Sequence, residues 1–112
     1  MQTIVAEPQS FVIQPDSYLN ASNAIEFKGQ VKTLVTQKQY KHMLVDMEKV
    51  EFLDSAGLMA LVYSLRLAQS QGIRFSLCSV SPSIRIIFEL TQLDRVFESF
   101  ESIVAFEAAL AV

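Results

Sequence analysis

Apolar and polar positions along the chain switch between short runs typical of strands and the three-to-four-residue spacing typical of helices. Residues 3–5 and 11–14 are β-prone, and a turn is expected between them at 8–10. Pro15 ends the second run, because proline lacks the amide that a strand would use. The two runs are near neighbours and are expected to pair as a hairpin.

The segment DSYLNASNAIEF is rich in Asn and Ser, which favour the beginning of a helix. Apolar residues then recur at helical spacing, so we predict a helix from about Ser22 to Gln39, with an apolar face formed by Phe27, Val31, Leu34 and Val35. The continuous apolar run HMLVDM, residues 42–47, is typical of a fully buried strand.

A second apolar helical stripe follows and ends before Gly72, a good C-terminal residue; its members are Leu58, Leu61, Val62 and Leu65. Residues 73–80 have the character of a central strand. Ser81-Pro82 predicts the start of another helix, because Ser is a preferred N-cap and Pro a preferred first residue. The inner face of that helix is expected at Ile84, Ile87 and Phe88.

The end of the chain adds a short strand expected at Val96-Phe97 and a helix marked by Ile103, Phe106 and Leu110. The predicted order is ββαβαβαβα. Strands separated by helices imply mostly parallel pairing with right-handed crossovers. We therefore expect an α/β fold: one domain over residues 1–112, with a mixed, mostly parallel sheet of four to five strands and about four helices.

Composition narrows the class of protein. The 112 residues suit one domain, and 51% apolar against 19% charged residues indicates a real core. A net charge of −3 argues against a nucleic-acid binder. No apolar run approaches the ~18 residues of a membrane span, and the N-terminus lacks signal-peptide features. The lone Cys78 forms no internal disulfide. We expect a cytoplasmic protein.

Residues for common catalysis are scarce. His42 is the only histidine, and Ser55 has no GxSxG sequence around it, so a small Ser55–His42 hydrolase ranks last among the functions considered. One His and one Cys cannot build a soft-ligand metal site, and the carboxylates lack the spacing of a calcium loop. No glycine-rich phosphate loop is present. We therefore predict neither a metal, a cofactor nor enzymatic activity.

The stretch FLDSAGL, residues 52–58, is the most informative motif. Asp54 and Ser55 are both preferred N-cap residues, so capping alone explains them. However, the motif follows a buried strand, where parallel-sheet domains commonly place their sites, and Gly57 would let another chain approach closely. Met59, Tyr63 and Arg66 fall on a face other than the core stripe, which indicates either a contact surface or a helix that is buried more broadly.

From residue 42 onwards, HMLVDMEKVEFLDSAGLMALVYSLRLAQSQGIRFSLCSVSPSIRIIFELTQLDRVFESFES resembles the STAS domain, in particular the stand-alone bacterial anti-sigma factor antagonists. The resemblance spans roughly residues 11 to 105 and rests on the ordered set of elements around Asp-Ser-x-Gly-Leu. The chain departs from the family at Ser17, where Gly is usual, and at Asn20, where Asp is usual. Asn20 can still cap the following helix, but it carries no charge.

The resemblance implies a partner switch. In that scheme the unmodified protein binds an anti-sigma factor or switch serine kinase, phosphorylation of the serine after Asp54 ends the binding, and a PP2C-type phosphatase restores it. The acceptor here would be Ser55; Ala56 removes a second hydroxyl that is often present. The implied partner-binding residues are Asn20, Asp54, Ser55, Ala56, Gly57, Met59 and Tyr63. A docking subunit of a larger assembly, such as a lipid-transport complex, is the alternative. We expect a monomer or weak dimer.

Overall fold

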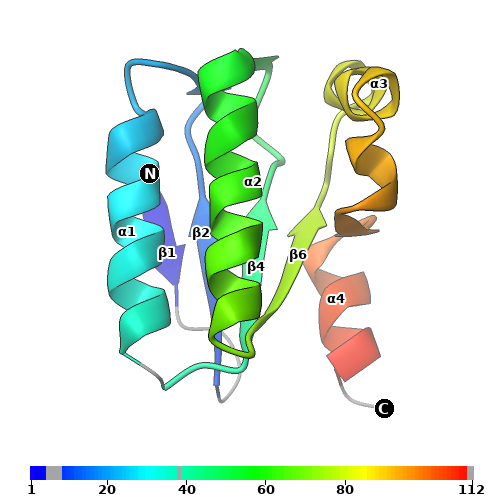
Figure 1. The fold of residues 1–112 in the computed structure, drawn as a ribbon. Coiled ribbons are helices and arrows are strands. Elements are labelled where there is room, and N and C mark those ends of the chain that lie inside the picture. Colours follow the sequence, from blue (N-terminus) through cyan, green and yellow to red (C-terminus); the bar gives the residue numbers. More distant parts are fainter. Residues whose placement is uncertain (5–8, 38, 111–112) are drawn as a thin grey trace.

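The computed structural model describes residues 1–4, 9–37 and 39–110 (Figure 1). Its main sheet has the strand order β1-β2-β4-β6-β7. The bounds are Gln2–Ile4 for β1, Ser10–Gln14 for β2, His42–Asp46 for β4, Arg74–Cys78 for β6 and Glu98–Phe100 for β7. β1 pairs antiparallel with β2, and the other neighbours pair in parallel. The predicted hairpin and the mostly parallel α/β sheet are therefore confirmed.

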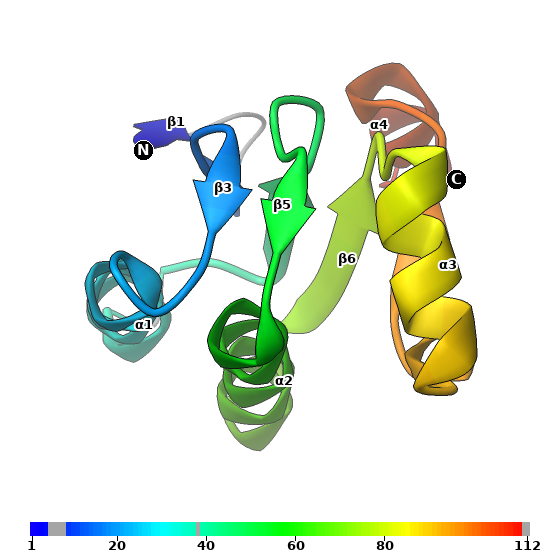
Figure 2. The same cartoon turned by 90° about the horizontal axis from the view of Figure 1, so that it is seen from above.

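Helices cover both faces of this sheet. α1 (Ala24–Thr36) and α2 (Ser55–Ser70) lie on one face, and α3 (Pro82–Leu90) packs at the β6 side (Figures 1 and 2). α4 (Ile103–Leu110) lies on the opposite face, where Phe106 packs against Val12, Leu44 and Cys78. Among the described residues, no helix combines the length and apolar character needed to cross a membrane.

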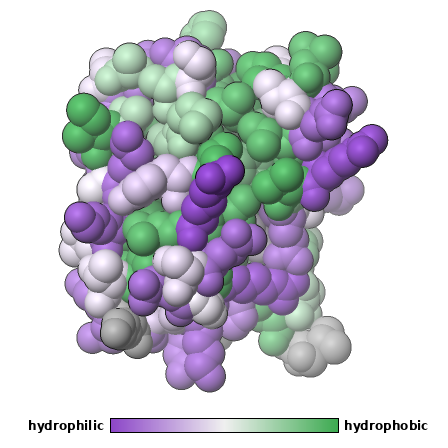
Figure 3. Space-filling model, in the orientation of Figure 1, coloured by the Kyte–Doolittle hydropathy of each residue, from purple (hydrophilic) through white to green (hydrophobic). Residues whose placement is uncertain are grey.

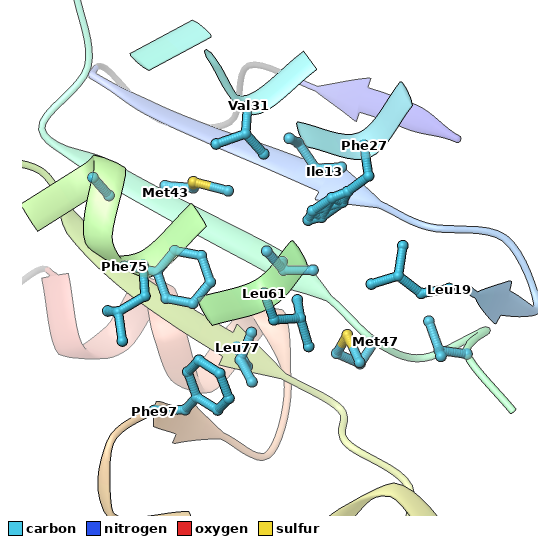
Figure 4. Close-up of a cluster of buried hydrophobic side chains, with 14 of the residues drawn as sticks. Ile13, Leu19, Phe27, Val31, Met43, Met47, Leu61, Phe75, Leu77 and Phe97 are labelled. Carbon is cyan, nitrogen blue, oxygen red and sulfur yellow. The ribbon is translucent and has the colours of Figure 1, made fainter. Parts of the chain in front are cut away.

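The main core lies between the sheet and the first two helices. Side chains alternate between the two faces of a strand, so every second residue of β2, β4 and β6 enters this core. Figure 4 shows Ile13, Met43, Phe75 and Leu77 from the sheet and Phe27, Val31 and Leu61 from the helices converging there. This packing fixes the position and direction of α2, the helix on which the candidate site lies.

A second, two-stranded sheet was not predicted. β3 (Tyr18–Leu19) and β5 (Phe52–Leu53) pair in parallel; β5 leads into α2 through Asp54, and β3 leads to α1 through a turn at residues 20–23 (Figure 2). The Ser17 carbonyl also accepts hydrogen bonds from the amides of Glu51, at 2.7 Å, and Phe52, at 3.2 Å. Strands of two residues are too short to show an alternating pattern, so only their pairing reveals them.

Helix predictions were correct in kind, with differences at the ends. The first helix was expected from Ser22 to Gln39 but is Ala24–Thr36, because the side chains of Asn20 and Asn23 build a turn before it. Within the expected range, Lys38 lies outside the described residues. Gly72 has a φ of +71° just after the end of α2, as expected of a glycine at that point. Ser81 caps α3 by accepting a hydrogen bond from the Ile84 amide at 3.3 Å.

The strand expected at Val96-Phe97 was wrong. The chain forms a short 3-10 helix at Leu93–Arg95, and the amides of Val96 and Phe97 both donate to the Leu93 carbonyl. Phe97 is buried against Phe75 and Phe88, and pairing with β6 begins only at Glu98. The first strand, expected at residues 3–5, is Gln2–Ile4, and the expected turn at 8–10 gives way to strand at Ser10; Val5 and Pro8 lie outside the described residues.

Candidate functional site

Ser55 is the first residue of α2, and it is exposed at the end of the molecule where the parallel strands finish. Asp54, not Ser55, is the N-cap: its Oδ1 accepts a hydrogen bond from the Gly57 amide at 2.9 Å. The Asp54 carbonyl accepts from the Leu58 amide, also at 2.9 Å. Since Asp54 performs the capping, the Ser55 hydroxyl is left available for another role.

The same carboxylate joins two loops. Asp54 Oδ2 accepts a hydrogen bond of 3.3 Å from the Ala21 amide, in the connection from β3 to α1. The two oxygens of one side chain thus bind the start of α2 and the approach to α1. The segment that contains Asn20 and the segment that contains Ser55 are therefore adjacent on the surface.

Gly57 is required by this junction, for a reason different from the predicted one. A Cβ built at Gly57 would lie 1.9 Å from the Leu19 carbonyl oxygen and 2.9 Å from Leu53 Cδ1. The glycine is buried, so the chain that approaches it closely is the protein's own β3. The expectation that Gly57 leaves space for another protein is therefore corrected: that space is already filled.

Asn20 shapes the neighbouring loop. Its Oδ1 accepts hydrogen bonds from the Ser22 amide at 2.9 Å and from the Ser22 hydroxyl at 2.6 Å. Its own amide donates to Asn23 Oδ1, and Asn23 Nδ2 donates to the Tyr18 carbonyl. The position that precedes α1 is Asn23, so Asn20 is not the helix cap that the sequence suggested. Asn20 is half-buried and lies beside Ala21, the partner of Asp54.

The outer face of α2 carries the other predicted residues. Met59 is 61% exposed, Tyr63 is 37% exposed with the Lys28 ammonium 5.7 Å from its ring centre, and Ala56 is half-buried. The buried side of the helix contains Ala60, Ser64 and Ala68, whereas Leu58 and Val62 of the expected core stripe are only half-buried. Figure 3 shows apolar surface gathered mainly toward the end of this face where α2 begins.

Small residues that recur every four positions also mark the buried face of α2, and the prediction from the leucine and valine positions left them out. Ala60, Ser64 and Ala68 recur at that spacing and are all buried. Together with the buried Leu61 and Leu65, they move the centre of the buried face away from Leu58 and Val62. The exposure of Met59 then follows, since it projects from the opposite side of the helix.

The site can hold an anion on Ser55. The amides of the first helical turn and the helix dipole favour negative charge at this end of the 16-residue helix. Exposed carboxylates are nearby in sequence at Glu48 and Glu51, with Lys49 between them. Added negative charge would therefore be tolerated by the helix and would mainly change the surface that a partner meets.

The structure does not bring His42 close to Ser55, as a Ser–His hydrolase would require. His42 begins β4 and Ser55 follows its far end, so they lie at opposite ends of the parallel strands. Burial lowers the pKa of His42, and the charges of Arg74 and Lys41 lower it further. Burial also raises the pKa of the Cys78 thiol to about 12, which makes it a poor nucleophile. In the described part of the chain, no three His, Cys, Asp or Glu side chains cluster to hold a metal.

Comparison with known proteins agrees with this architecture. The family model of the STAS domain matches residues 2–105. A Thermotoga maritima protein named "Putative anti-sigma factor antagonist" is 30% identical over 92 residues, which cover 82% of this chain and 81% of the relative.

Solved structures give the same result. The crystal structure under that name from Thermotoga maritima superposes with a TM-score of 0.86 at 28% identity, covering 99% of this chain and 92% of the other. The Bacillus protein SpoIIAA in its phosphorylated form shares the fold, with a TM-score of 0.77 at 18% identity, covering 96% of this chain and 97% of the other. The chain belongs to the STAS domain family.

Proposed function

We propose that this chain is a phosphorylation-regulated antagonist of an anti-sigma factor. In its unphosphorylated form it binds an anti-sigma factor that is itself a serine kinase, or a related switch kinase. Phosphorylation of Ser55 ends that binding, and a PP2C-type phosphatase restores it. The protein then acts by binding, without a catalytic step of its own.

The observation that carries the proposal is the division of roles at the start of α2. Asp54 caps the helix and holds the loop at Ala21, while the neighbouring Ser55 hydroxyl is exposed. A kinase can reach an exposed hydroxyl without unfolding the helix start. The names of the relatives support the choice of partner, since they describe those proteins as antagonists of anti-sigma factors.

The physical effect of the phosphate supports a switch at the surface. A phosphoserine carries about two negative charges and three acceptor oxygens. Placed beside Asp54 at the helix N-terminus, it leaves the fold intact but adds bulk and charge where Asn20, Ala56, Met59 and Tyr63 are proposed to meet the partner. Burying that charge in an interface without a matched partner is costly, so the bound state is the one that phosphorylation disfavours.

The test is phosphate transfer from labelled ATP by a purified anti-sigma factor kinase. Wild-type protein should be labelled and Ser55→Ala should not. Ser83→Ala is the control and should be labelled like the wild type; Ser83 is a second exposed serine in the first turn of a helix. Binding to the same kinase should be lost in Ser55→Asp and kept in Ser83→Asp. Labelling of Ser55→Ala would contradict the proposal by placing the phosphate on another residue. Full binding by Ser55→Asp with an intact fold would also contradict it and would favour the docking subunit without a phosphate switch.

A further inference from the structure

Two aromatic side chains stand exposed beside the candidate site. Phe52 is 68% exposed and Tyr18 is 39% exposed, and they are directly opposite each other in the parallel pair of β5 and β3. A single exposed apolar side chain is ordinary on a protein surface. Two exposed aromatic residues directly opposite each other on neighbouring strands are close enough for one partner to cover both, and together they form an apolar patch.

The strand geometry places this patch on the same surface as the proposed switch. Side chains two residues apart in an extended strand point to the same side. Asp54 follows Phe52 by two residues and has extended backbone angles, so it shares a side with Phe52. Asn20 directly follows β3, at the start of the turn that leads into α1. The hydrogen bond from the Ala21 amide to Asp54 shows that the two strands stay together beyond the aromatic pair. Asn20 and Asp54 thus lie at the ends of the two short strands that carry the aromatic pair.

The aromatic pair is also held firmly from below. Leu19, with no exposed surface, and the half-buried Leu53 point from the same two strands toward the core. The Ser17 carbonyl binds both the Glu51 and Phe52 amides, and Gly57 packs against the Leu19 carbonyl. Little backbone freedom therefore remains to be lost when a partner covers the patch, and aromatic side chains are among those that contribute most at interfaces.

We propose that Phe52 and Tyr18 are the apolar anchor of the interface that contains Ser55, and that they insert into an apolar pocket on the partner protein. This inference rests on the proposed function, because the occupant is taken to be the same kinase that binds around Ser55. The reason for that choice is continuity: Asn20 and Asp54 are the residues that directly follow β3 and β5, the two strands that carry the aromatic pair. Phe52, the more exposed of the two, supplies most of the contact.

The test compares Phe52→Ala with Leu90→Ala in binding to the anti-sigma factor kinase by calorimetry. Leu90 is 80% exposed on α3, so the control removes a similarly exposed apolar side chain from another surface. Phe52→Ala should weaken binding by about tenfold or more, as expected of a buried aromatic anchor, and Leu90→Ala by less than about twofold. Thermal unfolding of both variants should match the wild type, because neither side chain is part of the core.

The outcomes separate this inference from the proposed function. If Phe52→Ala binds as tightly as the wild type while Ser55→Asp does not bind, the aromatic anchor is overturned and the switch stands. If wild-type protein sediments as a dimer that Phe52→Ala dissociates, the patch is covered by a second copy and the anchor is again overturned. The aromatic anchor is supported if Phe52→Ala loses kinase binding while Leu90→Ala keeps it. Phosphate transfer to Ser55 of Phe52→Ala should then also be strongly slowed at low protein concentration.

Discussion

The starts of α2 and α3 are built from similar local parts and differ in what holds them. Each helix begins after a segment of parallel strand, has a side-chain N-cap, Asp54 or Ser81, and exposes a serine in its first turn, Ser55 or Ser83. The two caps bond the amides of Gly57 at 2.9 Å and Ile84 at 3.3 Å. Judged by the capping pattern alone, the two serines are equivalent.

Their surroundings are not equivalent. Ser81 bonds Ile84 and Ser83, both inside the helix that it caps. Asp54 also reaches Ala21 across 33 positions of sequence, and Gly57 packs against Leu19. The cap of α2 therefore joins two segments that are distant in sequence and lie beside the aromatic pair. Among the described residues, the cap of α3 bonds only residues of its own helix. This difference indicates why Ser55 rather than Ser83 is the proposed phosphate acceptor.

The largest expected effect on stability is that of Gly57→Ala. The added methyl group would collide with the Leu19 carbonyl, and the backbone of β3 or α2 must move to admit it. We expect a loss of about 3 kcal/mol in the free energy of unfolding, typical of strong overpacking, measured by urea denaturation. Gly29→Ala is the matched control, because a Cβ there meets nothing within 4 Å. It should gain about 0.5–1 kcal/mol from helix propensity. Equal, small effects of the two substitutions would show that the junction is loose.

A smaller effect is expected from removing the caps. Ser81→Ala should cost about 1 kcal/mol, the usual value of a lost N-cap. Asp54→Ala should cost about 1.5 kcal/mol, because an exposed hydrogen bond to Ala21 is lost as well. Hydrogen exchange distinguishes the two caps more sharply. The Ala21 amide should exchange faster in Asp54→Ala than in the wild type, and at the wild-type rate in Ser81→Ala. Unchanged exchange in both variants would mean that Asp54 does not join the loops in solution.

The smallest effect on stability is that of a negative charge at either serine. Ser55→Asp and Ser83→Asp each place a carboxylate in the first turn of a helix, where the dipole favours it. Both should raise the free energy of unfolding by about 0.5 kcal/mol at low salt, as measured by thermal denaturation. Strong destabilisation by Ser55→Asp alone would indicate that phosphate acts by unfolding the loop rather than by altering the surface.

The sequence predicted the elements that have a clear apolar periodicity or residues typical of a helix start or end. The apolar run from His42, the helix after Asp54, Gly72 with its positive φ and the Ser81-Pro82 cap all appear as expected, because each depends on residues close together in the chain. For Met59 the sequence left two interpretations open, an exposed contact surface or a helix buried more broadly, and the structure shows it exposed. Ser55 itself was identified from a motif and from resemblance to a family, and its role stays a prediction.

Other features depend on contacts between distant segments, and only the tertiary structure decided them. β3 and β5 are each too short to be recognised alone, and they exist because their backbones pair. Gly57 looks like a gap for another protein until Leu19 is seen to fill it, and the exposure of Phe52 emerges only from its register with Tyr18. The sequence by itself determined an α/β chain with a capped helix and a serine at its start. Folding decided which side chains surround that serine, because contacts across more than thirty residues follow from packing and not from local preference.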